Sequence, residues 1–443
     1  MAADASGLIL VPDAVARPRS VDEVAELIRQ CAANGTALTP AGAQTSTTGA
    51  SITDTGTLLS LRGLDRIIDI DASSMFAKVG AGVLLGDLQR ALSREQLFFA
   101  PDPTSEEEST VGGAIACNAS GPRTLRYGPT RSHVRALTIA FADGTLRELR
   151  RPLLEKNTVG YGIAQDPMDW FIGSEGTLGV IVEAELALLP EPRAVVGLGF
   201  PFASEPEALA FIVGARREAG LSARCLEYMD NRAVGIMRAA SGSATWAEGA
   251  HSMVYAEEVS EHDTTDASLD AWLALAEKHG ALTNDVQVYD SSAALKEARR
   301  LRHSVPASMN EQGNARRAQG GRKVSTDWAV PHERLAEAIA VARDFATDAG
   351  LEQPAIYGHA GNGHPHQNFI ARTADELRLV EAVVEQTLRY VVACGGTVAA
   401  EHGIGKIKRR WLALQLTPLQ LSMMHAIKRE LDPANMLAPG NIL

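Results

Sequence analysis

The sequence contains few cysteines, and they form no pattern that would build a site. Cys31, Cys117, Cys225 and Cys394 are widely scattered, and no two of them stand in a C-x-x-C pair. Neither a thiolate zinc site nor a disulfide framework is therefore expected. We expect four small buried side chains in a protein of the reducing cytoplasm.

The sequence also lacks an excess of basic residues and any long apolar run. Its 42 lysines and arginines are outnumbered by 54 aspartates and glutamates, which leaves a net charge of −12. This balance argues against non-specific nucleic-acid binding, because such binding depends on a basic surface. No apolar stretch approaches the length of a membrane-spanning helix, and no basic segment followed by an apolar run opens the chain. We therefore expect neither a transmembrane segment nor a signal peptide.

The length of the chain and the distribution of its elements indicate an α+β protein of several domains. A chain of 443 residues is too long for one ordinary core. The first 190 residues combine short strands, hairpins and few helices, whereas longer helices separated by strands follow Pro190-Glu191-Pro192. We expect one domain over residues 1–190, a second over residues 191–394 and a helical C-terminal segment over residues 395–443.

Hydrophobic periodicity and capping residues predict the main helices. Ser20, with Glu23 three residues later, begins the first helix, and Asn34-Gly35 end it. Asp143-Gly144 marks the turn of a hairpin. Further helices are expected over residues 84–95, 206–219, 267–279, 331–349, 374–393 and 417–431. The polar residues 310–322, rich in glycine and arginine, are expected to form a mobile loop.

Three segments in the first half of the chain are rich in small residues. They read PAGAQTSTTG (residues 40–49), PDPTSEEESTVGGAIACNASGPRTLRYG (residues 101–128) and FIGSEGTLGVI (residues 171–181). Small residues let backbone N–H groups approach an anion closely. The first segment matches neither the P-loop nor the G-x-G-x-x-G pattern, and taken alone it is more simply a surface loop. The order of the three segments together is specific.

Two segments in the second half concentrate imidazoles and an acidic residue. YGHAGNGHPHQNF, residues 357–369, holds three of the eleven histidines, and GGTVAAEHGIGK, residues 395–406, places Glu401 beside His402. A tight glycine turn between two strand ends can bring His359 and His366 to one point. Two imidazoles and a carboxylate suit Zn²⁺, Mn²⁺ or Fe²⁺, with positions left open for a substrate. A surface turn is the favoured alternative when such loops are considered alone.

Together these segments resemble the vanillyl-alcohol-oxidase, or PCMH-type, FAD-binding fold. The chain looks more closely like the FAD-linked D-2-hydroxyacid dehydrogenases, the family of D-lactate dehydrogenase and the glycolate oxidase catalytic subunit. The resemblance covers about residues 15–443. It implies a PCMH-type FAD-binding domain, an α+β substrate-binding domain and a helical C-terminal segment that packs back on the FAD domain. It also implies that FAD is bound non-covalently.

The resemblance assigns cofactor-binding residues to the small-residue segments. The family pattern of the first segment is Pro-Arg-Gly-Gly-Gly-Thr-Ser-x-x-Gly, and this chain departs from it at Ala41, Ala43 and Gln44. The change to glutamine bears most on the backbone path, because glycine is the more permissive residue. By the resemblance, the residues that hold FAD are Pro40, Gly42, Ala43, Gln44, Thr45, Ser46, Gly49, Pro101, Thr104, Thr110, Gly112, Gly113, Asn118, Gly121, Gly128, Glu175, Gly179 and Ile181.

The resemblance also assigns the metal-binding and catalytic residues. Carried over by position, His359, His366 and Glu401 are ligands of a divalent metal, zinc or manganese, and His402 is the general base. His364 stands where the family commonly has asparagine. Because His364 shares strand parity with His366, it can be an extra ligand, a substrate contact or a histidine that hydrogen-bonds to a ligand.

The chemistry implied is the oxidation of a 2-hydroxy acid. Metal coordination lowers the pKa of the substrate hydroxyl, His402 takes the proton, and the α-hydrogen leaves as hydride to flavin N5. Arg302 is the first candidate to bind the substrate carboxylate, since a guanidinium group can form two parallel bonds to it. Lys323 is a second candidate. A solvated surface charge is the alternative for both.

The expected function is the oxidation of a small D-2-hydroxy acid, such as D-lactate, to the 2-oxo acid. No second nucleotide motif is visible, so a quinone, a cytochrome or an electron-transfer flavoprotein is expected as acceptor instead of NAD. Alternatives are glycolate or D-2-hydroxyglutarate as substrate, an oxidase that uses O₂, a non-redox use of FAD as in the ether-lipid synthases, and a structural subunit. We expect a cytoplasmic protein that reaches the membrane only through its acceptor, and a homodimer is compatible with the sequence.

Overall fold

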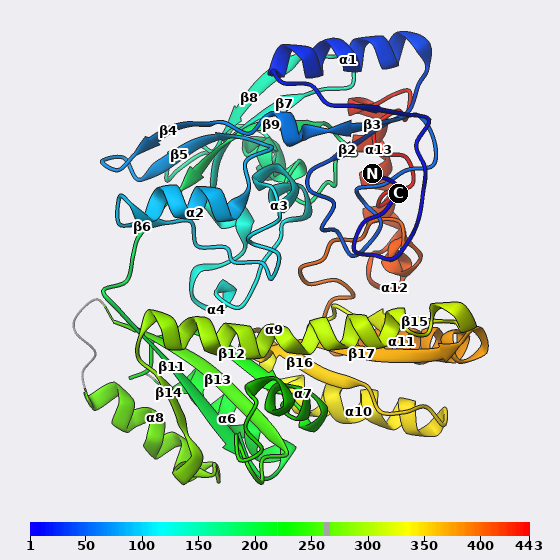
Figure 1. The fold of residues 1–443 in the computed structure, drawn as a ribbon. Coiled ribbons are helices and arrows are strands. Elements are labelled where there is room, and N and C mark those ends of the chain that lie inside the picture. The colour runs from blue at the N-terminus through cyan, green and yellow to red at the C-terminus, as the bar shows by residue number, and fades with distance from the viewer. Residues whose placement is uncertain (219, 261–265) are drawn as a thin grey trace. The chain divides into compact units, whose positions relative to one another are not determined.

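The computed structural model describes residues 1–218, 220–260 and 266–443, which fall into two compact units (Figure 1). Unit 1 comprises Met1–Gly121, Gly128–Glu191 and Glu401–Leu443. Unit 2 comprises Pro122–Tyr127 and Pro192–Ala400. Both units contain helices and sheets, so the α+β class expected from the sequence is confirmed.

Unit 1 is built from three small sheets. An antiparallel sheet has the strand order β4-β5-β9-β7-β8, a parallel sheet has the order β1-β3-β2, and β6 pairs with β10. The strands are β1 (Ala14–Ala16), β2 (Leu38–Ala41), β3 (Thr57–Ser60), β4 (Ile67–Asp71), β5 (Phe76–Gly80), β6 (Leu97–Phe98), β7 (Val134–Ala140), β8 (Leu146–Arg150), β9 (Val180–Ala187) and β10 (Leu189–Pro190). The helices are α1 (Val21–Asn34), α2 (Leu85–Ser93), α3 (Val111–Cys117), α5 (Gly162–Gln165), α12 (Leu412–Gln415) and α13 (Pro418–Leu431). The pair β7–β8 is the predicted hairpin.

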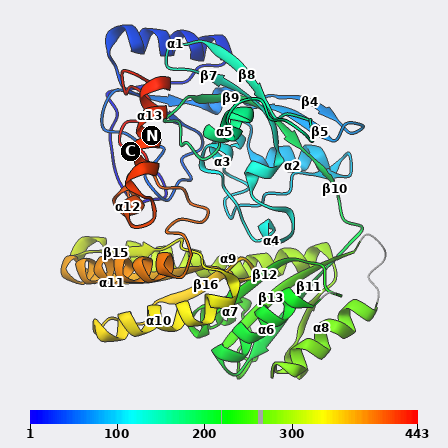
Figure 2. The same ribbon diagram turned by 180° about the vertical axis from the view of Figure 1, so that it is seen from behind.

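The start and the end of the chain meet within unit 1. Leu38 of β2 donates its N–H to the carbonyl oxygen of Met436 at 2.9 Å, and Ala438 donates to the carbonyl oxygen of Leu38 at 2.8 Å. The two termini lie close together in both views (Figures 1 and 2). The C-terminal segment is therefore a structural part of this unit.

Unit 2 is organised around one seven-stranded sheet with the order β14-β11-β13-β12-β16-β17-β15. The strands are β11 (Ala194–Phe202), β12 (Ala223–Met229), β13 (Ser252–Ser260), β14 (Gln287–Tyr289), β15 (Gly320–Ser325), β16 (Ala355–His359) and β17 (His364–Thr373). The helices are α4 (Thr124–Tyr127), α6 (Glu205–Arg217), α7 (Asn231–Ser241), α8 (Asp266–Lys278), α9 (Ser292–Asn314), α10 (Leu335–Asp348) and α11 (Ala374–Ala393). Helices α7 and α9 pack together and against the sheet.

Capping residues place the first helix as predicted. Oγ of Ser20 accepts the N–H of Glu23 at 3.2 Å, and Gly35 ends α1 in a left-handed conformation with φ +64°. The predicted helix over residues 374–393 coincides with α11. These ends are predictable because the residues that satisfy the terminal N–H and C=O groups are local.

One local prediction was wrong. Residues 310–322 are not a mobile loop, because they include the end of α9 and the start of β15. A Cβ built on Gly313 would lie 2.6 Å from Cβ of Lys323, so this glycine serves the close packing of helix and strand. The Thr-Val-Gly-Gly sequence forms the start of α3, where Oγ1 of Thr110 accepts the N–H of Gly113 at 3.2 Å.

Two of the four cysteines are buried. Cys31 and Cys225 are buried as expected, whereas Cys117 and Cys394 are partly exposed.

Among the residues that the structure describes, no helix combines the length and the hydropathy needed to cross a bilayer.

Candidate functional site

The three small-residue segments meet within unit 1. A Cβ on Gly42 would lie 2.2 Å from Oγ1 of Thr110, so the first segment touches the second. A Cβ on Gly176 would lie 2.3 Å from Cγ of Pro40, so the third segment touches the first. The N–H of Glu175 donates to a carbonyl oxygen of α3 at 2.9 Å, which joins the third segment to the second. The segments that the sequence grouped by composition therefore converge, and their glycines permit the close approach.

Gln44 has a left-handed backbone conformation, which glycine adopts more readily than other residues. Its φ is +60°, in the left-handed region. A residue with a side chain pays about 1–2 kcal/mol for this conformation. Nε2 of Gln44 donates to the carbonyl oxygens of Ser51 at 3.0 Å and Met1 at 3.1 Å, which offsets part of that cost.

The other residues expected to hold FAD lie on the same elements of unit 1. Asn118 ends α3 with φ +48°, and its Oδ1 accepts the N–H of Arg131 at 2.9 Å. A Cβ on Gly179 would lie 2.6 Å from Cγ2 of Ile139, so this glycine lets the third segment pack on β7. Pro101, Thr104, Gly121 and Gly128 lie in the segments before and after α3, Gly112 and Gly113 lie in its first turn, and Ile181 lies on β9.

The segment that carries Glu401 and His402 also belongs to unit 1. Residues 404–406 form backbone hydrogen bonds to the carboxylate of Glu175 and to the carbonyl oxygen of Thr48. Nε2 of His402 lies 3.4 Å from Oε1 of Glu401, and the imidazole is partly exposed. The expected base is thus anchored to the first and third of the segments expected to hold FAD.

The histidine-rich segment forms a hairpin in unit 2. Strands β16 and β17 pair His359 with His364 and Tyr357 with His366, so these four side chains share one face. The three imidazoles are buried, with ring centroids 4.7–5.3 Å apart. His364 therefore lies beside both predicted ligands, as its strand parity suggested.

Glu227 on β12 contacts one histidine of this cluster, and the sequence pattern did not predict this contact. Its carboxylate lies 2.6 Å from Nδ1 of His359 and 3.1 Å from Nε of Arg302. Burial alone would raise the pKa of Glu227, but the charges of His359 and Arg302 and their hydrogen bonds lower it to about 2. The carboxylate is therefore ionised and accepts a hydrogen bond from Nδ1–H of His359. Nε2 is then the nitrogen of that ring that can bind a metal.

The two residues proposed to anchor a carboxylate also lie in unit 2. Arg302 on α9 is buried, and its guanidinium carbon lies 5.4 Å from the ring centroid of Tyr357. Lys323 pairs with Ile370 and so shares the sheet face of His366. Burial lowers the pKa of Lys323 to about 8, and its Nζ donates to Oδ1 of Asn310 at 2.8 Å. Neither residue is a solvated surface charge.

Asp327 also lies beside the histidine cluster. It is buried, and its Oδ1 lies 3.0 Å from Nε2 of His364. The N–H of Ala400 donates to the carbonyl oxygen of Asp327 at 2.8 Å. Because Glu401 follows Ala400 directly, Asp327 fixes the chain one residue before an expected metal ligand.

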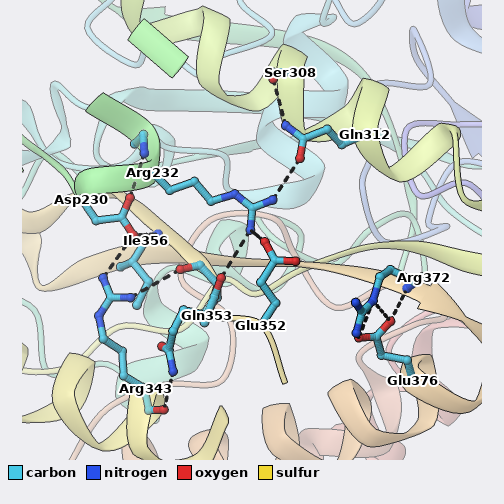
Figure 3. Close-up of polar contacts among 12 residues, drawn as sticks. Asp230, Arg232, Ser308, Gln312, Arg343, Glu352, Gln353, Ile356, Arg372 and Glu376 are labelled. Atoms are coloured by element: carbon cyan, nitrogen blue, oxygen red, sulfur yellow. Dashed lines mark hydrogen bonds and ion pairs between the residues drawn. The ribbon is translucent and has the colours of Figure 1, made fainter. Parts of the chain in front are cut away.

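A buried polar network holds β16 in place (Figure 3). The carboxylate of Asp230 accepts the N–H of Ile356 at 2.8 Å and the N–H of Ala233 at 2.9 Å. Nη2 of Arg343 lies 3.1 Å from Oδ2 of Asp230. Arg232 donates to Gln312 at 2.9 Å, which ties α7 to α9. These contacts fix the strand that presents His359.

The donors in unit 2 fit a divalent cation. The donor atoms of His359 and His364 lie within 4.8 Å of each other, and so do those of His366 and Asp327. Imidazole and carboxylate are ligands that zinc and similar metals accept, and a carboxylate behind a histidine is a frequent feature of such sites. Of the three ligands expected from the sequence, His359 and His366 belong to unit 2 and Glu401 belongs to unit 1.

Comparison with known families gives two matches that together span most of the chain. Residues 12–150 match a family described as FAD binding domain, and residues 189–442 match one described as FAD linked oxidases, C-terminal domain. The resemblance to FAD-linked enzymes that we stated from the sequence is confirmed by these matches.

Several known proteins are similar to this protein along almost the whole chain. The D-lactate dehydrogenase of Archaeoglobus fulgidus is 31% identical over 97% of this chain and 91% of its own length. The D-2-hydroxyglutarate dehydrogenase of Xanthomonas citri is 30% identical over 97% of this chain and 89% of its own length. The glycolate oxidase subunit GlcD of Bacillus subtilis is 29% identical over 98% and 89%. A solved structure of alkyldihydroxyacetonephosphate synthase superposes with a TM-score of 0.71 at 17% identity, over 96% of this chain and 75% of that protein, which supports the fold.

Proposed function

The chain belongs to the family of FAD-linked oxidases, and on that premise we propose that it oxidises a D-2-hydroxy acid of the D-lactate type to the 2-oxo acid. The observation that carries this proposal is the buried hairpin that groups His359, His364 and His366 beside the ionised Glu227. The names of three relatives, which concern D-lactate, glycolate and D-2-hydroxyglutarate, support the substrate class.

Two bound groups would supply chemistry that side chains lack. FAD, held non-covalently by the three small-residue segments of unit 1, would accept a hydride from the substrate. A divalent cation, zinc or manganese, held by His359, His366 and Glu401, would lower the pKa of the substrate hydroxyl.

The residues of the chain would bind the substrate and move its proton. His402 takes the hydroxyl proton on a ring nitrogen and, being partly exposed, passes it to water. Arg302 and Lys323 supply positive charge for the substrate carboxylate. Glu227 accepts a hydrogen bond from Nδ1 of His359, and this bond fixes the orientation of the imidazole ring for metal binding.

The reduced cofactor would then pass its electrons to a separate acceptor. We propose a quinone, a cytochrome or an electron-transfer flavoprotein, because the chain carries no second nucleotide motif for NAD. Such an acceptor could lie at a membrane, where the protein would be peripheral.

Anaerobic mixing of the purified protein with separate D- and L-hydroxy acids tests this function. The flavin absorbance at about 450 nm should be lost with one or more D-acids and kept with their L-isomers. Absence of bleaching with every acid, in protein loaded with FAD and supplied with zinc or manganese, would contradict the proposal. The rate of bleaching ranks D-lactate against glycolate and D-2-hydroxyglutarate.

The same experiment separates the alternative activities. Peroxide formed in proportion to substrate after air is admitted would favour an oxidase over a dehydrogenase. An enzyme that uses FAD without net redox chemistry would keep its flavin absorbance with every hydroxy acid.

A further inference from the structure

Glu175 has a conformation and an environment that need a physical reason. Its φ is +51°, a left-handed value for a residue with a bulky side chain, and the side chain is 5% exposed. Burial raises the pKa of Glu175 to about 7, opposed by the N–H groups of Ile404 and Gly405 and by the charges of Lys408 and Lys406. Strained, buried acidic residues persist where the surrounding structure compensates for them.

The loop that follows Glu401 and His402 compensates for the strain and the burial of Glu175 through hydrogen bonds. Oε1 of Glu175 accepts the N–H of Ile404 at 2.5 Å, and Oε2 accepts the N–H of Gly405 at 2.7 Å. Successive backbone N–H groups that point at one anion form a nest, which here encloses a side chain of the same chain. Both carboxylate oxygens are engaged in this way.

The loop has no space for movement around this carboxylate. A Cβ on Gly403 would lie 2.3 Å from Oε1 of Glu175, and a Cβ on Gly405 would lie 2.3 Å from the carbonyl oxygen of Thr48. That carbonyl oxygen also accepts the N–H of Lys406 at 2.9 Å. The loop therefore runs between the third small-residue segment and the first.

We propose that Glu175 is a positioning residue, whose carboxylate fixes the backbone of residues 403–405 and thereby the orientation of His402. This replaces the direct flavin contact that the family resemblance implied for Glu175. The inference rests on the proposed function, in which His402 is the base, but its structural part can be tested independently of activity.

The test compares Glu175→Gln with wild-type FAD-loaded protein. The amide group keeps the size of the side chain but turns one acceptor into a donor that faces a backbone N–H. Hydrogen exchange of the backbone amides of residues 404 and 405 should become about ten- to a hundredfold faster, while FAD content stays at the wild-type level. The rate constant of flavin reduction should fall by about tenfold or more, because the base is no longer held.

Two further variants control the interpretation. Glu183→Gln on β9 alters a partly buried acid of unit 1, which contacts Thr138 and Lys78, and should change neither hydrogen exchange of the loop nor flavin reduction. Gly403→Ala displaces the loop from the carboxylate without changing the acid, so it should reproduce the effects of Glu175→Gln. If Glu175→Gln fails to fold, Gly403→Ala still tests whether contact with the carboxylate holds the loop.

The results separate this inference from the proposed function. Unchanged exchange of residues 404 and 405 in Glu175→Gln, or loss of FAD without faster exchange, would overturn the positioning role. Faster exchange with an unchanged rate of flavin reduction would also overturn it. If wild-type flavin is not bleached by any hydroxy acid, the proposed function fails, and the exchange measurement still decides whether Glu175 holds the loop.

Discussion

The carboxylate of Glu227 lies 2.6 Å from Nδ1 of His359, in a strand pairing that sets β12 directly beside β16. Because the carboxylate also binds Arg302, one buried acid orients a predicted metal ligand and a predicted substrate anchor together. This shared partner makes the two groups interdependent.

Replacing Glu227 by glutamine should weaken metal binding. The amide cannot hold the Nδ1–H of His359 with a negative charge, and loss of such a partner typically lowers metal affinity by about 10–100-fold. Competition with a chelator measures the affinity, and FAD content should not change. Glu352→Gln, at an exposed partner of Arg232, is the control. Wild-type metal affinity in Glu227→Gln would show that His359 is not a ligand.

Replacing His402 by alanine should leave a yellow protein that is reduced slowly. The FAD segments are untouched, whereas loss of a general base typically slows proton transfer by about 10²–10⁴-fold. Stopped-flow absorbance under anaerobic conditions measures the reduction. His425→Ala alters an exposed histidine on α13 of the same unit and should reduce at the wild-type rate. A normal rate in His402→Ala would remove this residue from the mechanism.

The affinity for substrate should depend on the protonation of Lys323. Burial lowers the pKa of this group from 10.5 to about 8, so the ammonium is charged below pH 8 and neutral above it. If it binds the substrate carboxylate, KM rises as the pH passes 8, by a factor approaching ten per pH unit for a single titrating group. Lys323→Arg should abolish that rise, because guanidinium stays charged. A wild-type KM that is flat from pH 7 to about 9 would assign the carboxylate to Arg302 alone.

Replacing Gly42 by alanine should reduce both stability and FAD content. The added Cβ would lie 2.2 Å from Oγ1 of Thr110, and overpacking of this kind costs about 1–3 kcal/mol. Thermal unfolding and the ratio of flavin to protein absorbance measure the two effects. Gly235→Ala in α7 meets no atom within 4 Å and should be neutral or raise stability by about 0.5–1 kcal/mol. Full FAD content in Gly42→Ala would mean that the first and second segments can separate without loss of the cofactor.

The sequence predicted those parts of the site whose signal is local. Glycines separate His359 from His366, and Gly363 has φ +69° with the carbonyl oxygen of Val330 only 1.9 Å from where its Cβ would lie. A strand period of two residues was enough to group His364 with His366. Small residues that permit close backbone approach likewise marked the three segments of unit 1.

The sequence did not predict the parts that depend on distant residues. Glu227 stands in an otherwise ordinary strand sequence, and its partners Arg302 and His359 follow 75 and 132 residues later. An acid in a strand is mostly exposed, and only its partners show that it is buried and ionised. The end of α9 was missed for a related reason. The glycine and the polar residues at the end of α9 are typical of a loop. Only the structure shows that β15 packs against Gly313 there.

The pairing of Leu38 with Met436 and Ala438 sets the order in which the protein can be completed on the ribosome. Every residue of unit 2 has been translated before Met436 and Ala438, the C-terminal partners of Leu38, so unit 2 can fold while unit 1 is still unfinished. A nascent chain that stalls short of residue 436 would therefore hold an assembled histidine hairpin but an incomplete place for the flavin.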